Sequence, residues 1–141
     1  MKFSSQEEYG LRCLMRLGKD YYTLKNGLTI PEISQAEGIS QHVTAKIMRL
    51  LRLGGFVESA RGSQGGYSLS RAPENIILGD VFNALGGRLF DESFCENHSG
   101  DNNICTNSFD CSIKSVWTVI QKSVDNVVNQ ITLRDLFFEK Q

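Results

Sequence analysis

The sequence lacks a segment that could cross a membrane and lacks a recognisable export signal. Its 141 residues contain no run of about eighteen apolar residues. The N-terminal stretch MKFSSQEEYG does not show the basic and then apolar layout of a secretory signal. We therefore expect a soluble cytoplasmic protein that does not bind membranes, with about one domain's length of chain and a single hydrophobic core.

Sequence motifs typical of enzymes are also missing. The chain contains no glycine-rich phosphate loop and no HExxH metal-binding motif, and its only histidines are His42 and His98. No nucleophilic side chain has a partner histidine near it. We therefore expect that the protein is not an enzyme.

Charge is distributed unevenly along the chain. The formal net charge is −1, yet residues 1–72 carry ten Lys and Arg against six acidic residues, whereas residues 73–141 carry five against ten. A basic half is what contact with nucleic acid requires, because each neutralised phosphate releases condensed counterions. Charge alone is weak evidence, since many basic surfaces bind no nucleic acid.

The basic half carries the pattern of a helix-turn-helix. A first helix is predicted to run from a capping box at Ser4 to about Tyr22. Thr29 caps a second, short helix, the chain turns at Gly38, and Ser40 caps a third helix, which a pair of glycines ends. Two helices joined by a short glycine-containing turn form a helix-turn-helix, so the third helix is the predicted recognition helix.

One face of this third helix is apolar and the opposite face is polar. The residues predicted to pack inward are Val43, Ile47, Leu50 and Leu51. The outward face is formed by Gln41, His42, Ala45, Lys46 and Arg49. Polar side chains near the N-terminal end of a recognition helix read base edges in the major groove. An ordinary amphipathic helix with a solvated face explains the same pattern, so this helix alone does not decide the function.

The stretch FVESARGSQGGYSLS predicts a β-hairpin directly after the helix-turn-helix. Its second strand alternates Tyr67 and Leu69 with polar residues, and its tip is rich in glycine. A hairpin in this position is a wing. Arg61, at the base of the tip, is placed to reach phosphates or the minor groove. A solvated turn charge is the alternative, but flanking glycines that let the backbone approach DNA favour contact.

The acidic half ends in a long amphipathic pattern. Apolar residues recur at steps of three and four at Ile113, Val116, Ile120, Val124, Val127 and Ile131. Little chain is left to cover this stripe, so we expect a helix of about twenty residues to pair with its twin across a two-fold axis. The alternative is packing on its own domain, with Trp117 and Leu133 facing inward.

Three of the four cysteines lie in a polar loop. Nine and then five residues, rich in Asn, Asp and Ser, separate Cys95, Cys105 and Cys111. In a reducing compartment this pattern favours metal or redox chemistry over a structural disulfide. The alternatives are an iron–sulfur cluster, zinc with His98 as a further ligand, disulfide exchange between the last two cysteines, or an inert loop. The short ligand spacing usual in zinc sites is absent.

Several motifs follow one another in a specific order: MKFSSQEEYGLRCLMRL, IPEISQAEGIS, RGSQGGYSL, RAPENIILGDVFNALGG, the three-cysteine loop and ITLRDLF. Together they resemble the Rrf-type winged-helix transcription regulators, a family that includes the iron–sulfur cluster regulator IscR and the nitric-oxide sensor NsrR. The resemblance covers nearly the whole chain. It implies a homodimer that binds an imperfect inverted repeat of double-stranded DNA and holds an iron–sulfur cluster that adjusts this binding.

The resemblance also implies the cluster ligands. The three loop cysteines match the family's cysteines, and Cys111, at or just before a helix N-terminus, has its thiolate favoured by the helix dipole. Lys114 stands where IscR-like proteins place a ligand histidine, and an ammonium group cannot replace it. NsrR-like relatives use a carboxylate from the partner's first helix, a position that Glu8 holds here; His98, solvent or a small thiol are alternatives. Cys13, with apolar neighbours, is predicted to be a buried structural cysteine.

For DNA contact the resemblance implies Ser40, Gln41, His42, Lys46 and Arg61, and the outward position of Arg49 adds this arginine to the set. Ala45 stands where IscR-like recognition helices carry a glutamate that discriminates among operators. The target sequence is therefore not predicted.

We predict a mainly α fold with a small β-wing. It comprises a winged helix-turn-helix domain in residues 1–85, a cysteine-bearing cluster loop in residues 86–111, and a long dimerisation helix with a C-terminal segment in residues 112–141. The predicted function is that of a homodimeric repressor whose [2Fe–2S] or [4Fe–4S] cluster senses redox state, nitric oxide or iron–sulfur status. The alternative is a cluster-free regulator controlled by thiol oxidation, zinc or a partner protein. An electron carrier would not explain the recognition helix and the wing.

Overall fold

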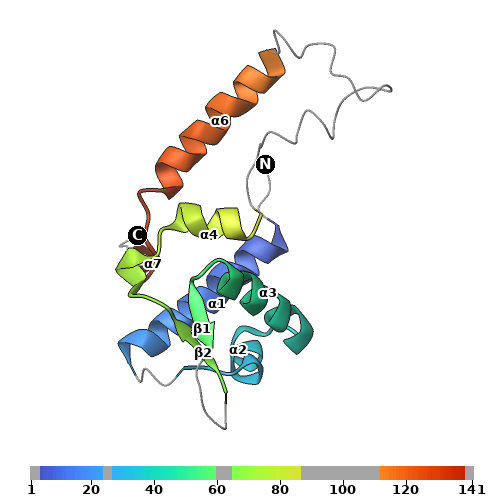
Figure 1. The fold of residues 1–141 in the computed structure, drawn as a ribbon, viewed down its shortest axis with the longest axis vertical. Helices are drawn as coiled ribbons and strands as arrows, with labels where there is room; N and C mark the ends of the chain where they lie inside the picture. The colour runs from blue at the N-terminus through green and yellow to red at the C-terminus, as the bar shows by residue number, and fades with distance from the viewer. Residues whose placement is uncertain (1–3, 24–26, 60–64, 87–111, 139–141) are drawn as a thin grey trace, which may run out of the picture.

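The computed structural model describes residues 4–23, 27–59, 65–86 and 112–138. Most of these residues are helical, and a two-stranded antiparallel sheet completes the fold (Figure 1). The predicted mainly α fold with a small β-wing is therefore confirmed. In chain order the elements are α1 (Ser5–Tyr22), α2 (Ile30–Glu37), α3 (Gln41–Leu53), β1 (Val57–Ser59), β2 (Tyr67–Leu69), η1 (Pro73–Asn75), α4 (Leu78–Ala84), α6 (Ser112–Val128) and α7 (Leu133–Phe138).

The predicted helix boundaries are confirmed by their caps. Ser4 and Thr29 each form a complete capping box at the start of α1 and α2. Gly38 ends α2 in the left-handed conformation, with φ of +67°, which a side chain at this position would oppose. Two residues later the Ser40 hydroxyl accepts a hydrogen bond from the Val43 amide (3.2 Å) and opens α3. The chain therefore reverses within a short turn and places α3 across α1 and α2, which it contacts.

The wing is built from β1 and β2. Val57 pairs with Leu69 and Ser59 with Tyr67 in an antiparallel register. Tyr67 also exchanges two backbone hydrogen bonds with Leu28, of 2.8 and 2.7 Å, in the segment before α2. This bridge ties the hairpin to the start of the helix-turn-helix. The tip of the hairpin, including the predicted DNA contact at residue 61, lies outside the described residues.

The core lies between α1, α3 and the hairpin. Its members with almost no exposed surface include Cys13, Leu14, Leu17, Ile33, Ile47, Met48, Leu51, Ile76, Val81, Leu85 and Leu133. The predicted burial of Cys13 is thus confirmed, and Leu133 faces inward, as the alternative for the C-terminal pattern held.

The buried face of α3 is wider than the sequence pattern predicted. Thr44 and Met48 are completely buried, whereas Val43 and Leu50 are only half-buried. Because α1, α2, α4 and β1 all contact α3, it is covered on more than one side. Thr44 is accommodated because its hydroxyl donates to the Ser40 carbonyl oxygen (2.8 Å), which satisfies the buried polar group.

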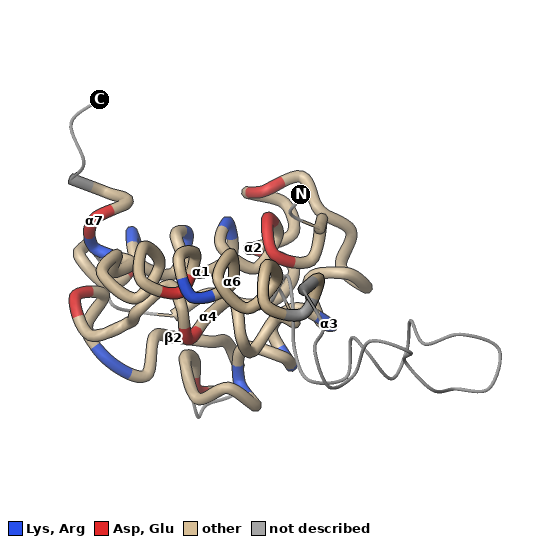
Figure 2. The backbone as a smooth tube through the Cα atoms, turned by 90° about the horizontal axis from the view of Figure 1, so that it is seen from above, with Lys and Arg blue, Asp and Glu red and all other residues tan. Residues whose placement is uncertain are grey.

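The C-terminal part forms two helices instead of one continuous stripe. α6 ends at Val128, so Ile131 does not continue its apolar face as predicted; it lies in the link to α7, where its carbonyl accepts from the Leu78 amide (2.9 Å). α7 then packs on α1 and η1, and Leu133 enters the core. Figure 2 shows α7 on the side of the molecule opposite α3.

α6 extends away from the core (Figure 1). Its 17 residues, at a rise of about 1.5 Å each, make a helix about 25 Å long. Four of its large apolar side chains are 55–63% exposed: Ile113, Val116, Val119 and Val127. Ile120 and Val124 are half-buried, as is Trp117. Within the described residues, no helix has both the length and the apolar character needed to span a membrane.

Candidate nucleic-acid interface

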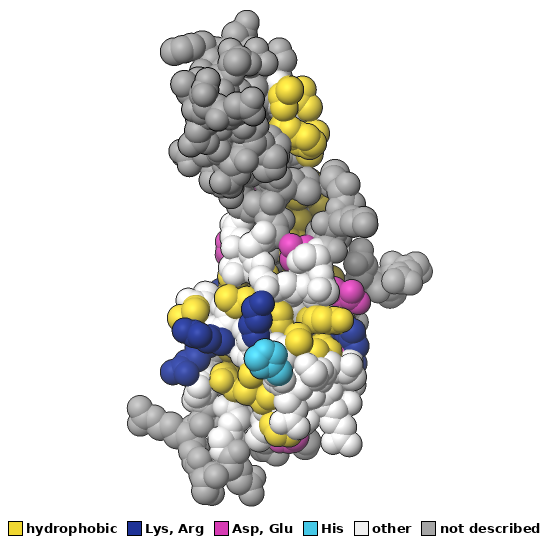
Figure 3. All heavy atoms as spheres, turned by 90° about the vertical axis from the view of Figure 1, so that its right-hand side faces the viewer, with side chains coloured by type: hydrophobic (Ala, Val, Ile, Leu, Met, Phe, Trp, Pro, Cys, Tyr) yellow, Lys and Arg dark blue, Asp and Glu magenta, His cyan; other side chains and the backbone are white. Residues whose placement is uncertain are grey.

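The outward face of α3 presents polar and basic side chains to solvent. Gln41, His42, Lys46 and Arg49 are exposed, and Ala45 is half-buried. Figure 3 shows the one histidine of the described residues lying beside Lys and Arg side chains on this face of the molecule. The structure thus brings together the residues that the sequence assigned to the recognition helix.

Arg52 extends this basic surface and was missed by the sequence reasoning. It is exposed one helical turn beyond Arg49, and α3 contains no acidic residue along its whole length. The sequence does contain the pattern that indicates Arg52, because the basic residues at 46, 49 and 52 recur at helical spacing. A helix with three cations and no carboxylate has the charge that phosphate contact needs.

The N-terminus of α3 offers a second kind of contact. Ser40 is exposed, and its hydroxyl oxygen serves the helix cap by accepting from the Val43 amide. The hydroxyl proton remains available to donate to another group. Amide groups at a helix N-terminus also favour anions through the helix dipole. Ser40 therefore lies where a DNA phosphate would be stabilised.

Arg71 fixes the base of the wing against the end of α3. Its guanidinium donates to the carbonyl oxygens of Asn75 (3.0 Å) and Gly55 (3.4 Å), and it lies 5.3 Å from the ring centroid of Phe56. Gly55 immediately follows the recognition helix. The wing and α3 are therefore held in a defined relation, which a two-part DNA contact requires.

Of the residues assigned to a cluster, only Glu8 lies in the described part of the chain. Cys95, Cys105, Cys111 and the alternative His98 lie outside it, as does Arg61 of the wing. The Glu8 side chain is 66% exposed, and its carboxylate is 4.0 Å from the Arg12 guanidinium. It is free of the capping role of its neighbour Glu7, which accepts from the Ser4 amide (2.8 Å).

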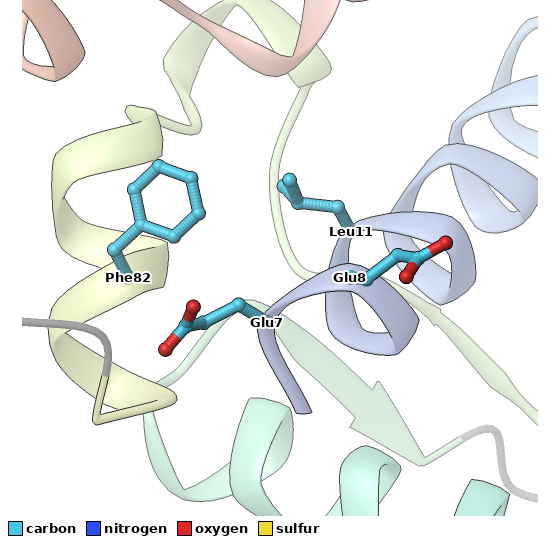
Figure 4. A pocket seen from close by; sticks show the side chains of 4 residues that line it. All are labelled: Glu7, Glu8, Leu11 and Phe82. Carbon is cyan, nitrogen blue, oxygen red and sulfur yellow. The ribbon is translucent and has the colours of Figure 1, made fainter. Parts of the chain in front are cut away.

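Glu8 lies at a pocket between α1 and α4. The pocket, of about 320 Å³, is lined by Glu7, Glu8, Leu11 and Phe82. In Figure 4 the Phe82 ring and the Leu11 side chain face the opening, while the two carboxylates point in different directions. Such an apolar pocket with a single exposed carboxylate at its edge does not by itself bind a cation.

The chain that leads into the cysteine loop starts beside this end of α1. Gln6 donates from its side-chain amide to the Leu85 carbonyl oxygen (2.7 Å). A Cβ atom on Gly10 would lie 2.4 Å from a Leu85 methyl group, so a side chain at residue 10 would require the Leu85 side chain to shift. Residue 87, the first of the loop segment outside the described residues, therefore follows a stretch that packs within one turn of Glu8.

Cys13 is unsuited to bind a metal. Its side chain is completely buried, and burial, together with the negative charge of Glu37, raises the pKa of the thiol to about 11 against the opposing effect of Arg12. A metal ligand must be a thiolate, which this environment disfavours. In the part of the chain that the structure describes, no three His, Cys, Asp or Glu side chains gather as a metal site.

The chain matches known regulators over almost its whole length. The family model Rrf2, described as an iron-dependent transcriptional regulator, matches residues 3–139. The HTH-type transcriptional regulator NsrR of Bacillus licheniformis is 31% identical over 141 residues, which cover 99% of this chain and 94% of that protein. Protein rrf2 of Nitratidesulfovibrio vulgaris is 30% identical over 136 residues, covering 96% and 87%.

Solved structures agree with these matches. IscR of T. potens superposes with a TM-score of 0.72 at 28% identity, covering 97% of this chain and 86% of that one. CymR of B. subtilis, described as the global cysteine regulator, gives a TM-score of 0.72 at 26% identity, covering 100% and 99%. NsrR and CymR are named HTH-type transcriptional regulators, in agreement with the prediction that the protein is not an enzyme. Family model, relatives and fold agree that this chain belongs to the Rrf2 family of transcriptional regulators.

Proposed function

We propose that this regulator is a DNA-binding repressor whose affinity for its operator is controlled by an iron–sulfur cluster. The observation that carries DNA binding is the exposed face of α3, which combines Gln41 and His42 with Lys46 and Arg49 on a helix without acidic residues. This face stands beside a wing whose base is fixed to the end of the same helix.

Each group on this surface has a role that its chemistry supports. Gln41 and His42, in the first turn of α3, reach base edges in the major groove, where amide and imidazole groups donate and accept hydrogen bonds. Lys46 and Arg49 bind phosphates, and Ser40 donates to a phosphate at the helix N-terminus. Arg61, at the base of the predicted wing tip, reaches phosphates or the minor groove.

Two copies of the chain are needed to read an inverted repeat. The exposed apolar side chains of α6, with Val119 at 63% exposure, form a face that a second copy covers by its own α6. A two-fold axis through this contact places two recognition helices about one DNA turn, 34–36 Å, apart. The operator is then an imperfect inverted repeat of double-stranded DNA.

The donor set fits an iron–sulfur cluster. Cys95, Cys105 and Cys111 supply three thiolates, and the exposed carboxylate of the partner's Glu8 supplies the fourth ligand, with His98 as the alternative. Three thiolates and one oxygen or nitrogen donor fit either [2Fe–2S] or [4Fe–4S]. The cluster supplies a centre that reacts with oxidants or nitric oxide. Through the partner's Glu8 the cluster would be tied to the partner's α1, and α1 packs on α3.

Iron and acid-labile sulfide, measured on protein purified without oxygen together with a visible spectrum, test the cluster. We expect matching iron and sulfide in the wild type, loss of both in Cys105→Ala, and retention of both in Cys13→Ala, because Cys13 lies in the core. Full iron and sulfide in Cys105→Ala would show that the ligand assignment is wrong.

Operator selection from a random DNA library tests the binding mode. We expect enrichment of inverted half-sites about 10–10.5 base pairs apart. Arg61→Ala should weaken binding to the selected site while leaving the cluster content unchanged. If neither the cluster-bearing nor the cluster-free protein enriches any sequence, sequence-specific DNA binding is refuted.

A cluster-free regulator controlled by its thiols, by zinc or by a partner protein is the second candidate. The observation that favours it is the similarity to CymR, the global cysteine regulator of B. subtilis, over 100% of this chain. The metal measurement separates the two: colourless, iron-free protein after attempted reconstitution favours thiol control, and stoichiometric zinc favours a zinc site.

A further inference from the structure

Glu37, the last residue of α2, is held by two arginines from α1. The Arg16 Nε donates to one carboxylate oxygen (2.7 Å), and the Arg12 Nε donates to the other (3.3 Å). The Arg12 guanidinium also donates to the backbone carbonyl oxygen of Glu37. The Glu37 side chain is only 12% exposed, while those of Arg12 and Arg16 are 38% and 32% exposed. We call these three residues the Glu37 clamp.

The clamp lies next to the turn that sets α3 in place. Gly38, with its left-handed φ of +67°, follows Glu37 directly, and Ser40, two residues later, caps the recognition helix. α2 has eight residues and no basic side chain in its last turn. A helix this short is marginal alone, and its C-terminal carbonyls favour cations. The two arginines of α1 supply these cations from another element.

The charge of Glu37 is maintained by the clamp. Desolvation by burial raises the pKa of the carboxyl, but the hydrogen bonds and positive charges of Arg16 and Arg12 outweigh it and hold the pKa below its ordinary value. The carboxylate is therefore ionised at neutral pH and keeps both arginines in place.

We propose that Glu37 is a positioning residue, which fixes the recognition helix through Arg12 and Arg16. The inference rests on the proposed DNA binding. Electrostatics alone predicts that DNA affinity rises when Glu37 is neutralised, because a negative charge is then removed from the DNA-binding half. Our proposal predicts the opposite change, because loss of positioning weakens binding.

The first test compares Glu37→Gln with Glu32→Gln in the full-length, cluster-free protein. Both substitutions remove one charge from α2, and Gln at residue 32 can still complete the capping box. We expect Glu37→Gln to bind the selected operator about tenfold more weakly, the loss that follows when partly buried, charge-assisted hydrogen bonds are removed. Glu32→Gln should bind as well as the wild type or slightly better. Equal or tighter operator binding by Glu37→Gln overturns the proposal.

A second readout separates positioning from folding. Binding to random DNA depends on phosphate contacts alone. Misfolded protein would lose both specific and non-specific affinity, whereas misplaced α3 lowers the ratio of specific to non-specific affinity. We expect this ratio to fall in Glu37→Gln and in Arg16→Lys, which keeps the charge but loses the planar fork. An unchanged ratio in both variants contradicts positioning.

Hydrogen exchange tests the clamp without DNA. Faster exchange of the Ile39 and Val43 amides in Glu37→Gln is expected, because these amides bond to Ser34 and Ser40 around the turn. Unchanged exchange overturns the inference whether or not an operator is found. If the amides exchange faster in Glu37→Gln but the wild type binds no DNA sequence specifically, the proposed function is refuted and the clamp still stands.

Discussion

Leu133→Ala tests whether the C-terminal segment belongs to the cooperative core of the winged domain. Leu133 begins α7, has no exposed surface, and lies in the core cluster with residues of α1 and α3. Its amide donates to the Ile76 carbonyl oxygen (2.8 Å), which anchors the link that follows α6. Loss of this side chain therefore weakens the attachment of α7 and α6 together.

The magnitude follows from burial. Replacing Leu by Ala removes three carbons, and at about 0.8 kcal/mol for each buried methylene the lost transfer free energy is about 2.4 kcal/mol. The residual cavity adds to this, so we expect the free energy of unfolding to fall by about 3–4 kcal/mol, within the usual range for a buried leucine. In a chain of this size the melting temperature then falls by roughly 10 °C.

Urea unfolding followed by circular dichroism, at one fixed protein concentration, measures the change. Leu53→Ala is the matched control, because Leu53 is 74% exposed at the end of α3 and its truncation should cost less than about 0.5 kcal/mol. A loss below about 1 kcal/mol in Leu133→Ala, or a separate early transition for the C-terminal helices, would refute the reasoning.

Three further predictions concern single side chains. Lys46→Ala should weaken binding to all DNA sequences and lower the slope of log affinity against log salt by about 0.9. The control Lys122→Ala replaces an exposed lysine on α6 and should leave the slope unchanged. An unchanged slope in Lys46→Ala would show that Lys46 makes no phosphate contact. Cys13 should resist a thiol reagent at about pH 8 in the folded protein and react in denaturant, because it is buried and its pKa is about 11; labelling in the folded state would contradict the burial. Because the folded-state pKa of Glu37 is depressed, its stabilisation is present at neutral pH and is lost as pH falls below about 4.3 towards the folded pKa. Acid unfolding should therefore show a smaller loss of stability in Glu37→Gln than in the wild type, and parallel curves would count against the clamp.

Local signals were enough to predict the helix-turn-helix. The caps at Ser4, Thr29 and Ser40 and the left-handed Gly38 act within three or four residues of chain, so the sequence records them directly. The outward face of α3 followed from the same periodicity. The assignment of the three loop cysteines and of residue 61 stays a prediction, because those positions lie outside the described residues.

Periodicity failed where another element decided the outcome. Val43 and Leu50 were predicted to pack inward but are only half-buried, whereas Thr44, which was assigned to neither face, is completely buried. Neighbouring elements cover α3 on more than one side, and the Thr44 hydroxyl donates to the Ser40 carbonyl oxygen. Ile131 continued the apolar spacing of α6, yet α6 ends three residues earlier, and the link pairs with the segment before α4. Neither the burial of Thr44 nor the end of α6 can be read from a short window of sequence.

The sequence by itself determined the local architecture and the basic outward face of α3, because each depends on residue type and short spacing. Only the tertiary structure decided which distant groups meet. Glu37 is separated from Arg16 and Arg12 by 21 and 25 positions, and packing of α2 on α1 brings them within hydrogen-bonding distance. The return of α7 to α1 likewise depends on chain closure. Contacts between residues far apart in sequence arise from packing of whole elements, which no single segment encodes.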